Sequence, residues 1–164
     1  MIVTTDNTAT SNNTETFLKS IVTARKHFFK NRDDLQYLCI EDFILKEGKA
    51  FKPKPLPDKY EPGEIKQCFR NAFLLSLGHM ELTYVEGYAF CENLIPVHHA
   101  WCVDPDGNVV DPTWRDTGIE YIGVPFSQKY AMSLIQKKGC YGILDMNKDL
   151  LKGKLPKGAI QKDF

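Results

Sequence analysis

The sequence predicts an α+β fold in which helices cover an antiparallel sheet, and three observations support this class. Apolar residues recur at helical spacing near the N-terminus, and a strongly apolar helical stretch follows over residues 64–78. After this stretch come several short segments of alternating polarity, separated by turn residues. Helices that precede a run of consecutive strands are typical of a helical layer packed on an antiparallel sheet.

The chain has 164 residues, which is the size of one domain that can bury its own hydrophobic core. Residues 1–13 are rich in Thr, Asn and Ser and contain few large apolar side chains. This composition predicts a flexible tail. We therefore expect a single folded domain over residues 14–164.

Charge and hydropathy argue against two classes of partner. The 21 basic and 21 acidic residues leave a net charge of zero, so no basic surface for nucleic acid is expected. No apolar run reaches the roughly 20 residues that span a bilayer, and the N-terminus lacks the pattern of a signal peptide. Five irregularly spaced cysteines argue against a disulfide framework. These features predict a cytoplasmic protein with reduced thiols and no membrane partner.

Two helices are expected before a proline-rich connection. The first carries apolar residues at helical spacing: Phe17, Ile21, Ala24 and Phe28. The second is expected to begin at Asp33 and Asp34. Residues 48–62 contain four prolines and are predicted to form an extended surface loop.

The rest of the chain is predicted to alternate strands with two helices. The expected elements are a buried helix over 64–78, strands over 82–90, 97–104, 108–114 and 120–126, a helix over 127–139 and a short strand over 141–146. Glu86 lies in a mostly apolar strand, so we expect it to be exposed or salt-bridged, with a supporting role behind a site as the alternative.

A predicted hairpin decides between two adjacent histidines. The turn DPDG has Pro and Gly where a type I turn with a glycine bulge needs them, so Asp104 should pair with Asn108. Counting along the antiparallel ladder places His99 and Asp111 on the same face as diagonal neighbours. His98 should point to the opposite face, since side chains alternate along a strand.

The candidate nucleophile is Cys68, at the start of the apolar helix. Unpaired backbone N–H groups and the helix dipole favour a thiolate at such a position. His99, oriented by Asp111, is the candidate general base. The backbone N–H of Cys68, helped by the side chain of Gln67 or Asn71, is a candidate oxyanion donor.

Simpler interpretations exist for each residue taken alone. A cysteine in an apolar helix is commonly an inert core residue, and Asp111 before a proline can cap a turn. Trp101 and Trp114 are expected to belong to the core or to form pocket walls. His98, His99, Cys91 and Cys102 as zinc ligands are disfavoured, because adjacent strand residues point apart and no Cys-x-x-Cys pair accompanies them. No metal or cofactor is therefore expected.

Three short segments resemble the core of the transglutaminase-like superfamily, a branch of the papain-like cysteine enzymes. They are Gln67-Cys68-Phe69, His99-Ala100-Trp101 and Asp111-Pro112-Thr113, and the likeness covers residues 61–126. The resemblance implies a Cys68, His99 and Asp111 triad on an α+β fold, with the cysteine-bearing helix packed against the sheet. The Arg-Gly-Gly lead of arylamine N-acetyltransferases is absent, and no acidic calcium-binding cluster is evident. Acetyl-CoA chemistry and protein cross-linking are therefore less favoured.

These inferences predict a thiol hydrolase or acyltransferase. It would act on an amide or isopeptide-like bond of a protein, a peptide or a small amide, by protease, amidase, deamidase or transglutaminase chemistry. The alternative is a catalytically silent binding or inhibitory protein on the same fold, encoded by a phage and directed at a host factor.

Overall fold

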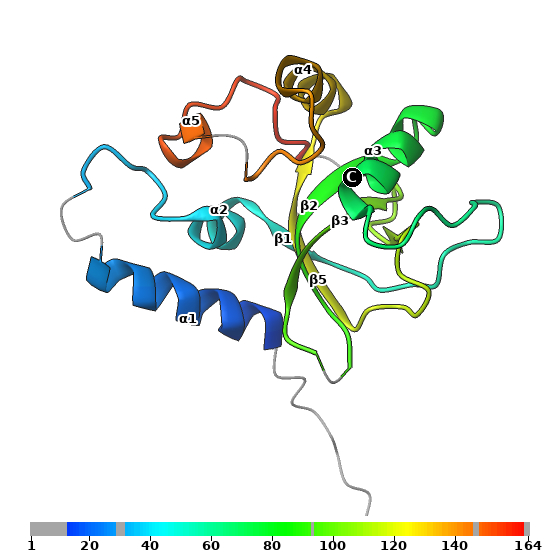
Figure 1. The fold of residues 1–164 in the computed structure, drawn as a ribbon, viewed down its shortest axis with the longest axis horizontal. Helices are drawn as coiled ribbons and strands as arrows, with labels where there is room; N and C mark the ends of the chain where they lie inside the picture. The colour runs from blue at the N-terminus through cyan, green and yellow to red at the C-terminus, as the bar shows by residue number, and fades with distance from the viewer. Residues whose placement is uncertain (1–12, 29–31, 93, 146–147, 163–164) are drawn as a thin grey trace, which may run out of the picture.

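A five-stranded antiparallel sheet forms the centre of the computed structural model, which describes residues 13–28, 32–92, 94–145 and 148–162 (Figure 1). The strands are β1 (Lys49–Phe51), β2 (Thr83–Phe90), β3 (Val97–Val103), β4 (Val109–Val110) and β5 (Glu120–Phe126). They lie in the order β1-β5-β2-β3-β4. The expected tail over 1–13 falls outside the described residues except for Asn13, which is helical.

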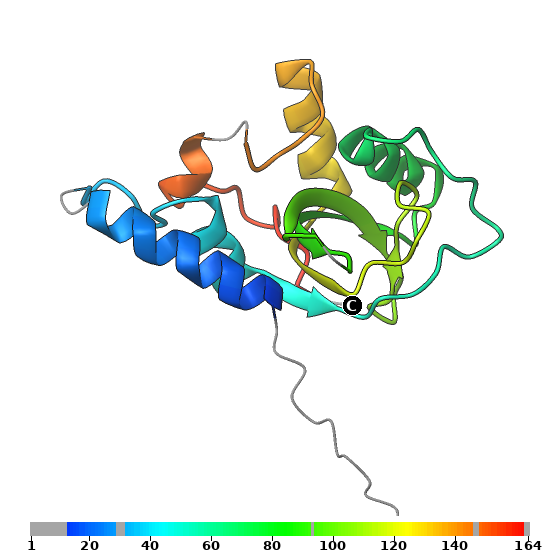
Figure 2. The same cartoon turned by 60° about the horizontal axis from the view of Figure 1, so that its bottom comes forward.

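The sheet curls until its two edges meet (Figure 2). The backbone N–H of Lys52, just after β1, donates to the carbonyl of Gly107 at 3.2 Å, and the N–H of Val109 in β4 donates to the carbonyl of Lys52 at 2.9 Å. Since β1 and β4 are the outer strands of the order, these bonds join opposite edges. The curl leaves no open edge at this point, and it brings strands that are not neighbours close together.

Five helices are described around this sheet, and with it they confirm the predicted α+β class. They are α1 (Asn13–Phe28), α2 (Ile40–Glu47), α3 (Cys68–Gly78), α4 (Gln128–Lys138) and α5 (Lys148–Leu151). In Figure 1, α1 and α2 lie to the left of the sheet, α4 lies above it and α3 lies to its upper right. Helix α3 packs mainly against β3 and also contacts β2.

The first half of the chain follows the prediction in outline, with four differences. The helix predicted over 64–78 begins only at Cys68, as α3. The buried side of α1 is formed by Thr14, Leu18 and Val22. Of the predicted residues, Phe17 and Ile21 are partly buried, whereas Ala24 and Phe28 are exposed. The buried face is thus rotated by about one residue relative to the predicted one.

The second helix begins at Ile40 and not at Asp33. The N–H groups of Gln36 and Tyr37 donate to the carbonyl of Leu151 at 2.9 and 3.0 Å, and the N–H of Leu38 donates to Asp42. Because the carbonyl of Leu151 and the side chain of Asp42 satisfy these donors, this segment needs no helical turn.

Strand β1 occupies the beginning of the predicted loop over 48–62. Its residues, Lys49–Phe51, precede the first proline of the segment at Pro53, so nothing prevents them from pairing with β5. The prediction extended the effect of the prolines too far upstream. The remainder of the segment runs without a regular element to the start of α3.

The hairpin prediction is confirmed in its register. The N–H of Asp104 donates to the carbonyl of Asn108 at 3.0 Å, and Gly107 adopts the left-handed φ of 76° that the turn requires. Cys102 pairs with Val110 as the counting demands. The second strand is shorter than predicted, because β4 ends at Val110 and the chain leaves the ladder at Asp111.

The predicted strand over 141–146 is wrong, and so is the expected exposure of Glu86. Residues 141–145 form turns, and Glu86 is completely buried beneath them. Its carboxylate accepts hydrogen bonds from the backbone N–H groups of Ile143 at 2.6 Å and Leu144 at 3.0 Å, and from the hydroxyl of Tyr84 at 2.6 Å. The carboxylate of Glu86 therefore accepts the backbone hydrogen bonds that a neighbouring strand would accept if this segment were itself a strand.

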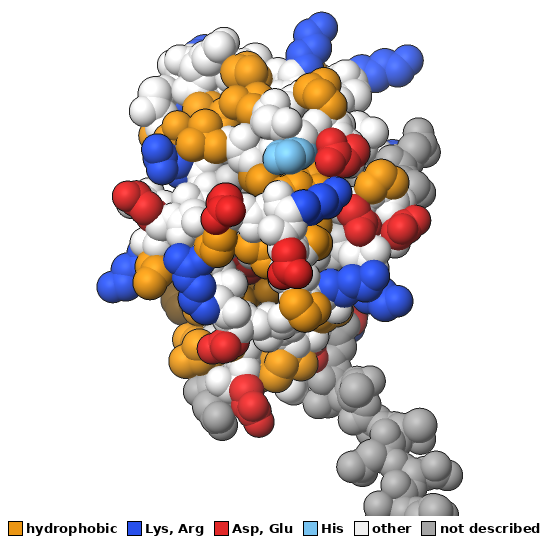
Figure 3. All heavy atoms as spheres, turned by 90° about the vertical axis from the view of Figure 1, so that its right-hand side faces the viewer, with side chains coloured by type: hydrophobic (Ala, Val, Ile, Leu, Met, Phe, Trp, Pro, Cys, Tyr) orange, Lys and Arg blue, Asp and Glu red, His pale blue; other side chains and the backbone are white. Residues whose placement is uncertain are grey.

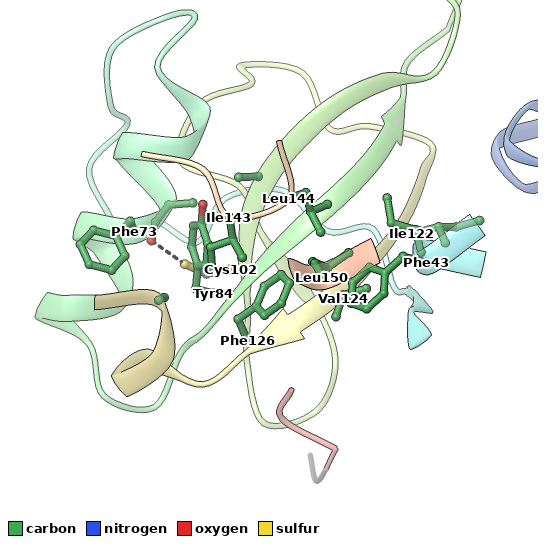
Figure 4. Packing of buried hydrophobic residues seen from close by; sticks show 14 of the residues in the cluster. Phe43, Phe73, Tyr84, Cys102, Ile122, Val124, Phe126, Ile143, Leu144 and Leu150 are labelled. Carbon is green, nitrogen blue, oxygen red and sulfur yellow. Dashed lines mark hydrogen bonds between the residues drawn. The ribbon is translucent and has the colours of Figure 1, made fainter. Parts of the chain in front are cut away.

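The core divides into two clusters. The larger lies between the sheet and the helices, and Figure 4 shows Phe73 of α3, Tyr84 of β2 and Phe126 of β5 within it. Cys102 joins β3 to α3 there by donating its thiol hydrogen to the carbonyl of Ala72 at 3.1 Å. The smaller cluster fills the inside of the curl. It consists of Phe51, Val85, Ala89, Trp101, Val103, Val109 and Tyr121. No described helix is long and apolar enough to cross a membrane.

Candidate active site

Cys68 is the first residue of α3 and is partly buried. The chain enters the helix by a sharp turn, in which Lys66 has a left-handed φ of 66°. Such a conformation is uncommon for a residue with a side chain and is found often at functional sites. The backbone N–H of Cys68 has no acceptor within the helix, since the first N–H groups of any helix lack one. Both the thiol and a backbone donor therefore lie at the same helix end.

His99 lies on β3 with its side chain almost fully enclosed, at 3% exposure. Its Nε2 is 2.7 Å from Oδ2 of Asp111, which is 6% exposed. The hairpin register predicted this pairing of His99 with Asp111, and the observed distance confirms it. A short contact between two buried, oppositely charged groups holds the imidazole ring in one orientation.

The two oxygens of Asp111 hold different partners. Oδ1 accepts hydrogen bonds from the backbone N–H groups of Thr113 at 2.9 Å and Trp114 at 3.3 Å, which caps the turn after β4. Oδ2 contacts His99 and accepts the hydroxyl hydrogen of Tyr121 at 3.1 Å. The two roles predicted as alternatives for Asp111, turn cap and histidine partner, therefore occur together.

Cys68 is close enough to the ring of His99 to raise the pKa of the histidine. Burial by itself lowers the pKa of His99, but the hydrogen bond to Asp111, the proximity of Cys68 and the charges of both raise it to about 9. The ring of His99 therefore favours the charged imidazolium form at neutral pH. His99 therefore lies between Cys68 and Asp111, close to the first and in direct contact with the second.

His98, the neighbouring histidine, has a different environment. Its Nδ1 is 3.2 Å from Oδ2 of Asp145, and its ring stacks on Tyr88 with centroids 5.6 Å apart. It also meets the ring of Phe69 edge-on. The predicted division of the two histidines between opposite faces of β3 is confirmed.

The two tryptophans expected near the site take different positions. Trp114 stacks on His99, with ring centroids 4.3 Å apart, and lines a pocket of about 710 Å³. Trp101 is fully buried within the smaller core cluster. Of the two places expected for it, Trp101 therefore takes the core and is not a pocket wall, because its position on β3 directs it into the closed interior of the curled sheet.

Asn71 does not point a free donor at the site. Its Nδ2 donates to the carbonyl of Glu64 at 2.7 Å and to Oγ1 of Thr113 at 3.0 Å. Both amide hydrogens are thus engaged, which corrects its assignment as an oxyanion donor. The amide instead joins α3 to the segment after Asp111. Gln67 is exposed, and its side chain makes no capping bond to the helix.

Sequence reasoning missed Tyr121 and Thr113. Tyr121 lies on β5, and its contact with Asp111 depends on the curl of the sheet, which no local pattern reveals. The turn that Asp111 caps brings Thr113 to Asn71, and no local pattern reveals this contact either. No group of three or more side chains among the described residues is arranged to hold a metal ion.

Comparison of the chain with models of known protein families, with curated protein sequences and with solved structures gave no match. The resemblance to the transglutaminase-like superfamily therefore stays a prediction, and any assignment of function depends on the geometry of the site.

Proposed function

We propose that the protein is a cysteine-dependent enzyme that transfers the acyl group of an amide or isopeptide-like bond. The observation that carries the proposal is the buried contact of His99 with Asp111 at 2.7 Å, with Cys68 at the start of α3 close enough to the same ring to raise its pKa. Thiol nucleophile, base and orienting carboxylate in this arrangement are what acyl transfer through a thioester requires.

In this mechanism the sulfur of Cys68 attacks the carbonyl carbon of the amide. Because Nε2 of His99 is engaged by Asp111, its other nitrogen, Nδ1, holds the proton from the thiol. That proton passes to the nitrogen of the leaving amine or ammonia as the C–N bond breaks, which leaves a thioester on Cys68. His99 then takes a proton from water or from an acceptor amine as it attacks the thioester, and the thiol is regenerated.

The developing oxyanion needs donors at the helix end. The backbone N–H of Cys68 is free of helical bonding there, and the exposed side chain of Gln67 is available as a second donor. Asp111 stabilises the imidazolium of His99 and keeps its ring aligned, since both of its oxygens are fixed by other contacts.

Selective alkylation tests this proposal. At pH 6 an ordinary thiol with a pKa of about 8.5 is less than about 1% ionised, so only an activated cysteine reacts quickly with iodoacetamide. Peptide mapping should find Cys68 modified well before the other cysteines. Burial raises the pKa of Cys39 to about 11, so Cys39 serves as the slow internal reference.

Turnover provides the second measurement. The wild-type protein should release ammonia or amine from a library of peptide amides, and Cys68→Ala should not. Cys68 reacting no faster than Cys39 in the folded protein would overturn the proposal. An activated Cys68 with no release from any amide would instead favour the catalytically silent binding protein.

A further inference from the structure

The pocket of about 710 Å³ opens beside the proposed catalytic residues, and none of the residues that line it takes part in the proposed proton transfers or oxyanion contacts. Trp114, which stacks on His99, forms part of its lining, and so does Ile65 in the loop that leads into α3. The pocket therefore borders both the base and the segment before the nucleophile. Its volume is in the range of pockets that hold small-molecule ligands, so a single side chain would occupy only part of it.

Aliphatic side chains gather in this lining and remain open to water. They are Ile65, Leu94, Val97 and Ile119, which are 68%, 60%, 37% and 49% exposed. Figure 3 views the side where the loop before α3 and the segment after β4 lie, and it shows hydrophobic side chains between acidic and basic ones. Apolar surface kept in solvent around a pocket is typical of a binding site, because its burial by an apolar ligand is favourable.

The charged residues of the lining disfavour an anionic ligand. Glu92 and Asp116 are acidic, and the single basic residue, Arg115, already donates to the carbonyl of Gly63 at 3.1 Å. Burial and the charges of Asp111 and Asp116 raise the pKa of the pocket residue Cys91. A carboxylate entering the pocket would meet the same unfavourable potential.

We infer that this pocket receives a large aliphatic side chain, of the size of leucine, from the substrate next to the amide bond that Cys68 attacks. The inference rests on the proposed function for the position of that bond. Such a pocket makes the enzyme selective for amides flanked by an aliphatic residue over those flanked by an acidic one. Leu94 and Ile119 are the specificity-determining residues, since both are exposed at the pocket and take no part in the catalytic contacts.

Cys91 allows a test that needs no turnover. Because Cys91 lines the pocket, a bound side chain should shield it from alkylation. In the Cys68→Ala variant, N-acetyl-leucinamide at about twice its dissociation constant should slow modification of Cys91 by about threefold. N-acetyl-aspartamide with a free side-chain carboxylate, at the same concentration, should leave the rate unchanged. Equal shielding by both amides, or shielding by neither, would overturn the inference.

Variants of the lining sharpen the test. Leu94→Ser and Ile119→Ser, each made in the Cys68→Ala background, should remove most of the shielding. Met80→Ser is the matched control, since Met80 is 78% exposed and lies outside the pocket. In the otherwise wild-type enzyme, Leu94→Ser should raise KM for leucine-flanked amides and leave kcat little changed.

The two proposals fail in different ways. If the enzyme cleaved leucine-flanked and aspartate-flanked amides with equal kcat/KM, and neither shielded Cys91, the pocket assignment would be overturned. The thiol mechanism would still stand. Selective shielding without turnover of any amide by the wild type would overturn the proposed function and leave a binding site for apolar ligands.

Discussion

Tyr121 donates its hydroxyl hydrogen to Oδ2 of Asp111 at 3.1 Å, the same oxygen that contacts Nε2 of His99. Tyr121 belongs to β5, which is separated from β3 in the sheet by β2. The contact exists because the sheet curls and closes around its smaller core cluster. The fold therefore anchors the orienting carboxylate from three sides: β3, β5 and the turn after β4.

Removal of that hydroxyl should loosen the carboxylate. We expect Tyr121→Phe to lower the free energy of unfolding by about 1–2 kcal/mol, because a buried hydrogen bond to a charged group is lost. Alkylation of Cys68 at pH 6 should slow severalfold as His99 loses alignment. Tyr60→Phe is the control, since the hydroxyl of Tyr60 contacts Glu81 at 3.3 Å away from the site. Wild-type stability and labelling in Tyr121→Phe would show that this bond supports neither.

The two histidines provide a test of which face of β3 carries the base. His99→Ala should abolish both the rapid alkylation of Cys68 and any amide release, because the base and its link to Asp111 disappear. His98→Ala should retain both and lose only its pairing with Asp145 and its ring contacts, within about 0.5–3 kcal/mol of stability. Circular dichroism checks that each variant folds. The opposite pattern would assign the base to His98.

Substitution of the carboxylate separates geometry from charge. Asp111→Asn can keep the bonds from Thr113 and Trp114 to its oxygen, so the variant should fold. It cannot stabilise the imidazolium of His99 and can force the wrong tautomer. We expect turnover to fall by up to about 10⁴-fold, the loss known for the corresponding change in a serine protease. Full activity in the folded Asp111→Asn protein would remove Asp111 from the mechanism.

The raised pKa of His99 makes stability depend on pH with a definite sign. Its pKa is 6.5 in an unfolded chain and about 9 in the fold, so the folded state binds the proton more tightly. The raised pKa contributes up to about 3 kcal/mol to the free energy of unfolding. This contribution is complete below about pH 6.5 and is lost as the pH rises through about 9. Urea unfolding between pH 6 and 9.5 should show this decline in the wild type. His99→Ala should lack it, and an equal decline in both proteins would contradict the assignment.

Local signals predicted the parts of the site that depend on short stretches of chain. The turn DPDG fixes the register between Asp104 and Asn108, and that register alone placed His99 with Asp111. The helix signal around Cys68 needed no knowledge of distant strands.

Some of the failures share a physical cause, which is a contact with a residue distant in sequence. The start of α2 was misplaced because Leu151 accepts from Gln36 and Tyr37. The sequence leaves Trp101 open between core and pocket wall, because the closure of the sheet around it depends on pairing between its two edges. Neither relationship leaves a periodic pattern in the sequence, and so neither was available to a prediction from local spacing.

Glu86 is the clearest such case and leads to a further prediction. Its buried carboxylate accepts from Tyr84, Ile143 and Leu144, and burial raises its pKa. Glu86→Gln keeps the shape but replaces one acceptor oxygen by an NH₂ group. Whichever way the amide is turned, at least one of the donors then faces another donor, which should cost about 1–3 kcal/mol of stability.

The loss should be concentrated in the turns over residues 141–145. Hydrogen exchange at the amides of Ile143 and Leu144 should accelerate in Glu86→Gln, because the carboxylate that holds them is gone. Glu41→Gln is a matched control, since Glu41 accepts one bond, from the hydroxyl of Tyr88 at 2.8 Å, and an amide oxygen can accept the same bond. Tyr141 contacts the ring of Phe73 on α3, so loosened turns should also weaken the packing of the cysteine-bearing helix. Wild-type exchange rates at both amides in Glu86→Gln would mean that the apolar contacts of Ile143 and Leu144 hold the segment without the carboxylate.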